Sequence, residues 1–227
     1  MKLIAALLAL GVALAACNTP TPAVENANLR VAHLSPNTPN VDIWLDGQVV
    51  AALKNVPFKT VSGYLKIPVG KHDIAVYVTG TTTNPAINVT GVMLEKKNYT
   101  VGAIGLLNGT AAQALTAKIF EDDLTINATK ARVRVIHASP DAPAVDVGVK
   151  GDAPAAAVVK NIKFPDATAA YLELAPAIYP LEIRPTGTAT VALSFNTPAL
   201  EAGKVYTVFA VNTLAKLEVV AVPDAAL

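Results

Sequence analysis

Residues 30–42 read RVAHLSPNTPNVD, and residues 134–146 read RVIHASPDAPAVD. When the comparison is extended to Gly47 and Gly151, nine of the 18 aligned positions carry the same residue. Further matches follow in the same order at spacings that drift only from 104 to 107 residues: KNVPF at 54–58 with KNIKF at 160–164, YL at 64–65 with YL at 171–172, and YTV at 99–101 with YTV at 206–208. A repeat of about 105 residues is the size of a whole domain and is too long for a solenoid unit. The sequence therefore predicts two homologous domains.

Each copy has the residue pattern of β-structure. Residues 41–46 (VDIWLD) alternate apolar and polar side chains, as a half-buried strand does. Further runs rich in Val, Ile, Thr and Tyr are separated by Gly, Pro or Asn, and they cover 63–67, 72–79, 89–94, 99–107 and 114–120. About seven or eight short strands in each copy predict an all-β fold of two tandem β-sandwich domains, Ig-like or transthyretin-like in architecture. We place the domains at 29–123 and 131–224, with 122–130 as the linker.

The N-terminus has the pattern of a bacterial lipoprotein signal. A basic Met1-Lys2 precedes an apolar run over 3–13, which is too short to span a bilayer of about 30 Å. Residues 14–17 read LAAC and match a lipobox, so we expect a signal peptide over 1–16 that is removed before Cys17. The alternative is an ordinary signal peptidase site followed by a chance cysteine.

The resemblance to bacterial lipoproteins implies a diacylglycerol on the Cys17 sulfur, usually with a third acyl chain such as palmitate on its amine. Two or more acyl chains anchor a protein stably to a membrane. Residues 17–28 are polar after the cysteine and carry two prolines, so we expect them to be a lipidated tether. This predicts a location in the cell envelope, on a membrane outside the cytoplasm.

The composition indicates folded domains, since 52% of the residues are hydrophobic and 15% are charged. Cys17 is the single cysteine, so no disulfide can form within the domains. The chain has 18 Lys and Arg against 17 Asp and Glu, and residues 1–16 contain one Lys and no acid. The mature chain would therefore balance at 17 against 17, which argues against nucleic acid as a partner.

The repeated motif holds the residue types of a Ser-His-Asp triad. Its members are His33, Ser35, Pro36, Pro39 and Asp42 in the first copy, and His137, Ser139, Pro140, Pro143 and Asp146 in the second. Each Ser directly precedes a Pro in what should be a rigid turn, and no glycine-flanked nucleophile elbow accompanies it. We predict a structural role, in which the His ring bonds into the following turn and the Asp accepts N–H groups from the Ser-Pro-x-x-Pro loop. Ligand binding and catalysis are the alternatives.

The sequence predicts no metal site and no cofactor. It contains three His and one Cys, whereas a closed zinc site takes four ligands. The acidic run at 121–123 lacks the spaced oxygen ligands of a calcium loop, so we interpret it as solvated linker; a weak Ca²⁺ site there or at Asp46 is the alternative. Trp44 shares the polar side of its strand and could stack on sugars, but Gly148 replaces it in the second copy. The alternative is a tryptophan covered by a loop or by the other domain.

Residues 137–147, HASPDAPAVDV, resemble the opening segment of a bacterial family known as domain of unknown function 4397. The first copy departs from that segment at Leu34, Asn37, Thr38, Asn40 and Ile43. The resemblance covers both domains. It implies secreted or envelope-attached proteins, often with tandem copies, and brings no established activity.

Two classes of function fit these observations. We predict a non-catalytic, membrane-anchored envelope lipoprotein that is not an enzyme and that contacts cell-wall polymer or another envelope protein. Tandem copies would raise avidity for an extended target. The alternative is an exported small-ligand or carbohydrate carrier, or an enzyme, with a pocket between the two domains.

Overall fold

The computed structural model describes residues 24–224. The predicted signal peptide, Cys17 and the tether up to residue 23 lie outside the described residues. No helix in the described part of the chain is long and apolar enough to cross a membrane. The cleavage site and the lipid anchor therefore stay predictions.

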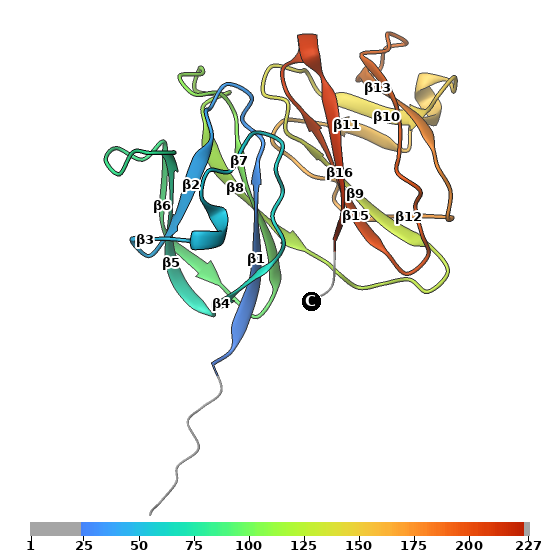
Figure 1. The fold of residues 1–227 in the computed structure, drawn as a ribbon. Coiled ribbons are helices and arrows are strands. Elements are labelled where there is room, and N and C mark those ends of the chain that lie inside the picture. Colours follow the sequence, from blue (N-terminus) through green and yellow to red (C-terminus); the bar gives the residue numbers. More distant parts are fainter. Residues whose placement is uncertain (1–23, 225–227) are drawn as a thin grey trace, which may run out of the picture.

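The described chain is built from strands, with three single turns of 3-10 helix (Figure 1). The first half contains β1 (Asn26–His33), β2 (Val41–Leu45), β3 (Gln48–Val49), η1 (Ala51–Leu53), β4 (Leu65–Pro68), β5 (Gly70–Val78), β6 (Ile87–Leu94), β7 (Asn98–Ile104) and β8 (Thr116–Asp122). The second half contains β9 (Ala131–His137), β10 (Val145–Val149), η2 (Pro154–Ala156), β11 (Val159–Ile162), β12 (Leu172–Leu174), β13 (Pro180–Pro185), β14 (Leu193–Asn196), β15 (Val205–Val211), η3 (Leu214–Lys216) and β16 (Glu218–Asp224).

These strands form two β-sandwiches, each made of two four-stranded sheets. In the first half the sheet orders are β3-β2-β5-β6 and β4-β1-β7-β8; in the second they are β11-β10-β13-β14 and β12-β9-β15-β16. The topology repeats, since β1 pairs parallel with β7 and β9 pairs parallel with β15. The predicted all-β fold of two tandem β-sandwiches is confirmed.

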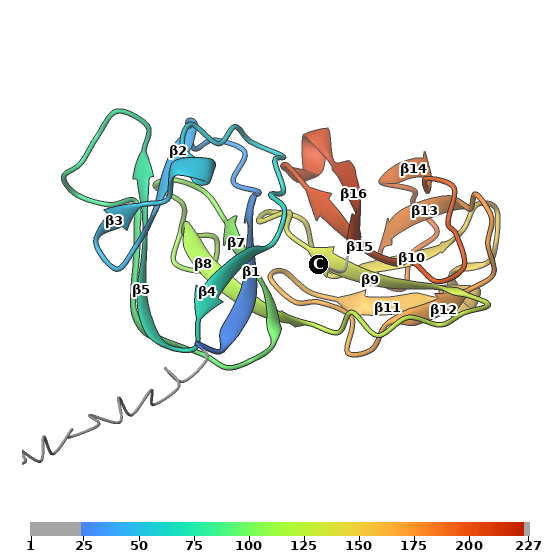
Figure 2. The same ribbon diagram turned by 60° about the horizontal axis from the view of Figure 1, so that its bottom comes forward.

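Strand β1 is buried on both of its faces, which shows how the two sandwiches meet. Val31 and His33 point into the first sandwich, whereas Arg30, Ala32 and Leu34 point toward the second domain. A third apolar core therefore lies between the domains, and its buried members are Ala32, Leu34, Ile104, Phe120, Ile136, Ala138, Phe209 and Val211. The molecule is a stack of four sheets with three cores, and the two sandwiches lie side by side in both views (Figures 1 and 2).

Two buried ion pairs cross the same interface in reciprocal fashion. Arg30 of the first domain donates to Asp224 of the second over 2.6 Å, and Arg134 of the second donates to Asp122 of the first over 2.6 Å. All four side chains are nearly inaccessible to water. Burial alone would lower the pKa of Arg30, but Asp224, Tyr64 and Asp122 outweigh it and raise the pKa. The arginine therefore stays charged inside the interface.

Matching hydroxyl groups complete this network on each side. Thr100 donates to Asp122 over 2.6 Å, and Thr207 donates to Asp224 over 2.7 Å. Both threonines belong to the YTV segments that the sequence repeat aligned. The Arg30 guanidinium also lies 4.9 Å from the centre of the Tyr64 ring, and the Arg134 guanidinium lies 5.3 Å from the Tyr171 ring. The interface thus has approximate two-fold symmetry.

The position of Asp122 corrects the predicted linker. We expected 122–130 to be linker and the acidic run at 121–123 to be solvated, but Asp122 is the last residue of β8 and is 3% exposed. Its carboxylate is held by Arg134, Thr100 and Tyr64, the last donating over 2.7 Å. The prediction failed because an acidic run with no visible partner looks solvated, and the partner here belongs to the other domain.

Removing one member of this network is expected to destabilise the protein strongly. Asp122→Ala leaves Arg134 buried without its anion and leaves two hydroxyl groups without their acceptor, so the free energy of unfolding should fall by about 3–5 kcal/mol. Urea denaturation measures this loss.

The control is another ion pair between the same two domains, which is exposed to solvent. Lys59 and Glu218 are 2.7 Å apart but remain 41% and 44% exposed. Lys59→Met keeps most of the side-chain stem and should cost less than about 1 kcal/mol. Equal losses in the two variants would show that the buried network contributes no more than an exposed pair.

Candidate functional site

Each motif histidine closes the turn that follows its own strand. His33 Nε2 lies 3.1 Å from the Pro39 carbonyl oxygen, and His137 Nε2 lies 3.0 Å from that of Pro143. Because a carbonyl only accepts, Nε2 carries the proton in both rings. Both rings are buried beside a phenylalanine edge, with centroid distances of 6.3 Å and 6.4 Å. Burial lowers the pKa of each histidine, so both rings are neutral near pH 7.

The motif serines do not stand in a triad geometry. Ser35 donates its hydroxyl to the Gly105 carbonyl over 2.7 Å and lies 2.6 Å from the Thr38 hydroxyl. The Ser139 hydroxyl is buried and has no partner in the described chain. In neither copy does a hydrogen bond join the serine hydroxyl to the histidine ring within residues 24–224. The arrangement that nucleophilic catalysis needs is therefore not formed at this motif.

The motif aspartates are bonded differently from the prediction. We expected Asp42 and Asp146 to accept N–H groups from the Ser-Pro-x-x-Pro loop, but their partners lie elsewhere, and both side chains are buried, at 8% and 7% exposed. Each accepts the backbone N–H of an asparagine, Asn55 or Asn161, over 2.7 Å. Both asparagines have a left-handed backbone, with φ of 54° and 51°, and this conformation turns each N–H toward the carboxylate.

Further donors hold the same carboxylates. The hydroxyl of Thr79 donates to Asp42 over 3.0 Å, and that of Thr186 donates to Asp146 over 3.1 Å. Burial alone would raise the pKa of each carboxyl group, but these bonds outweigh it and lower the pKa. Each aspartate therefore stays ionised and ties the start of β2 or β10 to two loops.

In each copy, one further residue of the motif loop makes a hydrogen bond that was not predicted from the sequence. Asn37 accepts the N–H of Leu107 over 2.8 Å, and Asp141 accepts the N–H of Leu214 over 2.7 Å. The sequence showed Asn and Asp at matching positions, and the common ability of their side chains to accept an N–H was the available signal. The motif thus fastens the loops around one end of each sandwich.

The remaining candidates of the sequence analysis fall on the outer sheet of the first domain. Asp46 lies 2.7 Å from His72 Nδ1, and no group of three or more His, Cys, Asp or Glu in residues 24–224 is placed to hold a metal ion. Trp44 is half-buried because one side of it meets the Tyr77 ring, with centroids 5.2 Å apart. At Gly148 a Cβ would lie 3.3 Å from the Ala157 Cα, so the loop around η2 covers this position in the second copy.

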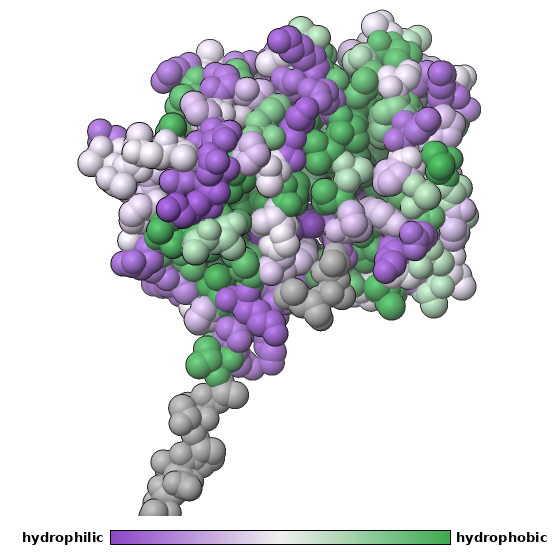
Figure 3. Space-filling model, viewed as in Figure 1, coloured by the Kyte–Doolittle hydropathy of each residue, from purple (hydrophilic) through white to green (hydrophobic). Residues whose placement is uncertain are grey.

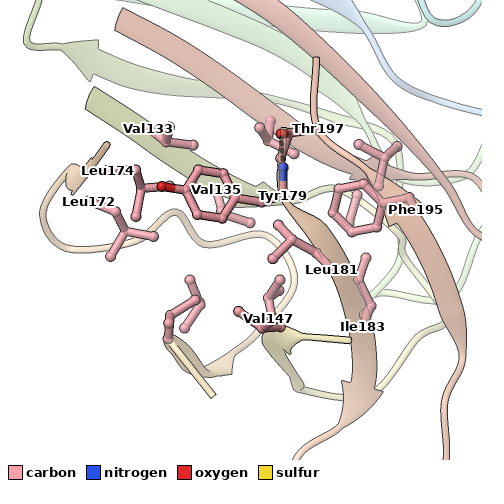
Figure 4. A pocket seen from close by; sticks show the side chains of 16 residues that line it. Val133, Val135, Val147, Leu172, Leu174, Tyr179, Leu181, Ile183, Phe195 and Thr197 are labelled. Carbon is pink, nitrogen blue, oxygen red and sulfur yellow. Dashed lines mark hydrogen bonds between the residues drawn. The ribbon is translucent and has the colours of Figure 1, made fainter. Parts of the chain in front are cut away.

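A cavity of about 90 Å³ lies between the two sheets of the second sandwich (Figure 4). Its walls are aliphatic and aromatic, and they include Val135, Val147, Leu181, Phe195 and Val208. The alternative function considered in the sequence analysis, a small-ligand carrier or an enzyme, would have its pocket between the two domains instead. An open groove does lie there, lined by Ile119, Phe120, Glu121, Asp123, Arg132, Arg134 and 167–171.

The comparisons with known proteins point to a family without an assigned activity. The family model described as "Domain of unknown function (DUF4397)" matches residues 27–148 and again 150–227. The comparison with curated proteins found no match. A solved structure of a "putative cell adhesion protein" from Bacteroides uniformis is 11% identical and is matched over 88% of this chain and 98% of that chain, with a TM-score of 0.20. At that TM-score the likeness carries no argument about this chain.

The buried histidines predict a loss of stability on mild acidification. Because the folded pKa of His33 and of His137 lies below the unfolded value of 6.5, the unfolded chain binds more protons below about pH 6.5. Stability should fall between pH 7 and pH 5, by at most about 1.4 kcal/mol per pH unit for each ring. Urea midpoints of the wild type and of a His33→Gln, His137→Gln variant measure this, and the variant should lose most of the slope.

His72 provides a control of opposite sign. Burial lowers its pKa, but the bonds to Asp46 and to the Pro68 carbonyl outweigh this and raise it. Its contribution is therefore present below pH 6.5 and is lost as the pH rises through the folded pKa. His72→Gln should make the acid slope steeper, and a slope that is identical in all three proteins would contradict both assignments.

Proposed function

This chain belongs to the DUF4397 family, and we propose that it is a non-catalytic module of the cell envelope that binds or supports another envelope component. The observation that carries this proposal is the use of the repeated motif. In both copies its histidine and aspartate side chains are bonded to backbone groups of their own domain. The polar residues that invited a catalytic interpretation therefore build loops, and the surface is left for recognition.

Membrane attachment is the second element of the proposal. It is supported by the basic start, the apolar run over 3–13 and the LAAC lipobox that ends at Cys17. The described strands begin at Asn26, only nine residues after Cys17, so an anchor there would hold the first domain close to the membrane.

The rigid pairing of the domains supports a role in binding or scaffolding. A third core and two buried ion pairs hold the sandwiches together, so a partner meets one body and not two units on a flexible linker. Partner binding to such a body costs less ordering entropy than binding to a flexible pair.

Two partly accessible features of the surface suggest what the partner contacts. Trp44 and Tyr77 form a half-buried aromatic pair on the outer sheet of the first domain, and apolar faces of sugar rings stack on aromatic rings. Figure 3 shows hydrophilic and hydrophobic residues interspersed, with hydrophobic ones gathered over β16, most of whose residues are half-buried. The first feature suits a cell-wall polymer, and the second, an edge strand, suits another envelope protein.

Replacing the cysteine tests the anchor. The Cys17→Ser chain cannot form the thioether, so it should accumulate as a precursor and lose incorporation of a labelled fatty acid. Membrane fractionation with metabolic labelling measures both properties. Equal label in the variant and in the wild type would contradict the proposed anchor.

Replacing the aromatic pair tests the polymer contact. Trp44→Ala should weaken co-sedimentation of the protein with purified cell-wall material by about twofold to tenfold, since loss of a stacking ring costs about 0.5–1.5 kcal/mol. Met93→Ala, at a position 54% exposed in the same sheet, is the matched control and should bind like the wild type. Unchanged binding by Trp44→Ala would favour an envelope protein as the partner.

A further inference from the structure

We propose that the second domain binds the end of an alkyl chain between its two sheets. The cavity of about 90 Å³ is enclosed by residues from both layers, with Val135 and Val208 from the inner sheet and Val147, Leu181 and Phe195 from the outer one. Figure 4 shows the rings of Tyr179 and Phe195 and the branches of Leu181 around the hollow. This inference does not depend on the lipid at Cys17 or on the partner of the aromatic pair.

Comparison of the two copies shows that side chains on one side of the cavity are smaller in the second domain. At three aligned positions the first domain has the larger side chain: Ile43 for Val147, Leu45 for Val149, and Leu53 for Val159. The frame is the same, because Ile43 pairs with Val76 as Val147 pairs with Ile183. The side of the second core formed by β10 and β11 therefore lacks three methylene groups, whereas Ile183 on β13 is one methylene larger than Val76.

Several substitutions in the second copy work in the opposite direction: Ile183 replaces Val76, Val219 replaces Ala117, and Phe195 replaces Val89. Phe195 lies opposite Leu181, at the place where Val89 lies opposite Ile74 in the first domain. The phenyl ring is larger than the valine side chain, yet Phe195 lines the cavity and does not close it.

The lining chemistry selects an apolar occupant. Water held inside a protein needs two to four polar partners, and an apolar cavity without them stays dry. The lining side chains carry two polar groups, and both are already engaged: the Tyr179 hydroxyl donates to the Ala175 carbonyl over 2.9 Å, and the Thr197 hydroxyl accepts the Tyr179 N–H over 2.9 Å. No lining residue is charged, so an ion, a sugar or a polar head group has no counterpart inside.

The size and the access select a slender occupant. The volume of about 90 Å³ is smaller than that of an engineered cavity that takes up benzene, which measures about 150 Å³. Val158 lines the cavity and is 48% exposed, so the cavity reaches the surface beside β11. An unbranched alkyl chain can enter there and leave its polar end in water.

Titration with sodium octanoate tests this proposal. The mature chain with Cys17→Ser, produced without residues 1–16, is used, because it carries neither acyl chains nor the apolar run over 3–13. Methyl NMR should show saturable shifts for Val147, Val208 and Ala210, and the melting temperature should rise with ligand concentration. The matching methyl groups of the first domain, Ile43, Val101 and Ala103, are the internal control and should stay in place. Shifts of equal size in both domains, or shifts that do not saturate, would overturn the proposal.

Filling the cavity provides the second measurement. Val147→Ile with Val159→Leu restores the side-chain sizes of Ile43 and Leu53, and it should weaken octanoate binding at least tenfold while raising the melting temperature. Val191→Thr, at a position 44% exposed and outside the cavity lining, should bind like the wild type. If the filled variant melts lower than the wild type or fails to fold, the core was already full and the proposal is wrong.

Discussion

The reciprocal pairs Arg30–Asp224 and Arg134–Asp122 are the constraint around which the rest of the structure is arranged. A buried guanidinium is tolerated only when an anion and further hydrogen-bond partners surround it, so these side chains fix the distance and rotation of the two sandwiches. The apolar core between the domains stabilises their association without directional preference, whereas the ion pairs select one relative orientation of the two sandwiches. The inner sheets consequently have no solvent face at the junction, and surfaces for recognition are left on the outer sheets, edges and loops.

Most of the fold could be predicted from residue periodicity. Apolar and polar side chains alternate along the strands of a sandwich with a period of two, and each strand pattern occurs in both copies of the repeat. The structural role of the motif was argued from the prolines that follow Ser35 and Ser139. The bonding of Asp42 could not be read in the same way, because it depends on a left-handed backbone at Asn55, thirteen residues away. The ionic interface was out of reach as well, since Arg30 and Asp224 are separated by 194 residues and no local pattern marks them as partners.

The two copies keep their frame and differ in what they expose or enclose. Where the first domain presents Trp44, the second has Gly148 beneath the loop that carries Ala157. Where the first domain fills its core with Ile43, the second leaves space beside Val147. Even a shared bond is made by different side chains, since His72 reaches the Pro68 carbonyl and Tyr179 reaches that of Ala175. The contacts that build the shared fold therefore allow side chains on the outer sheet and in the core to differ between the two domains.

The approximate two-fold symmetry of the interface has a consequence for how such a chain can arise. A contact in which one arginine meets the other copy's aspartate, and the reverse, is the contact that two identical chains make across a dyad. An ancestor with a single copy would have the same surface and would pair with itself. Gene duplication and fusion turn that homodimer into one polypeptide, whose two halves stay associated at any dilution. Once joined, the halves are no longer obliged to be identical, and a dimer bound by symmetry becomes a single chain with two different sides.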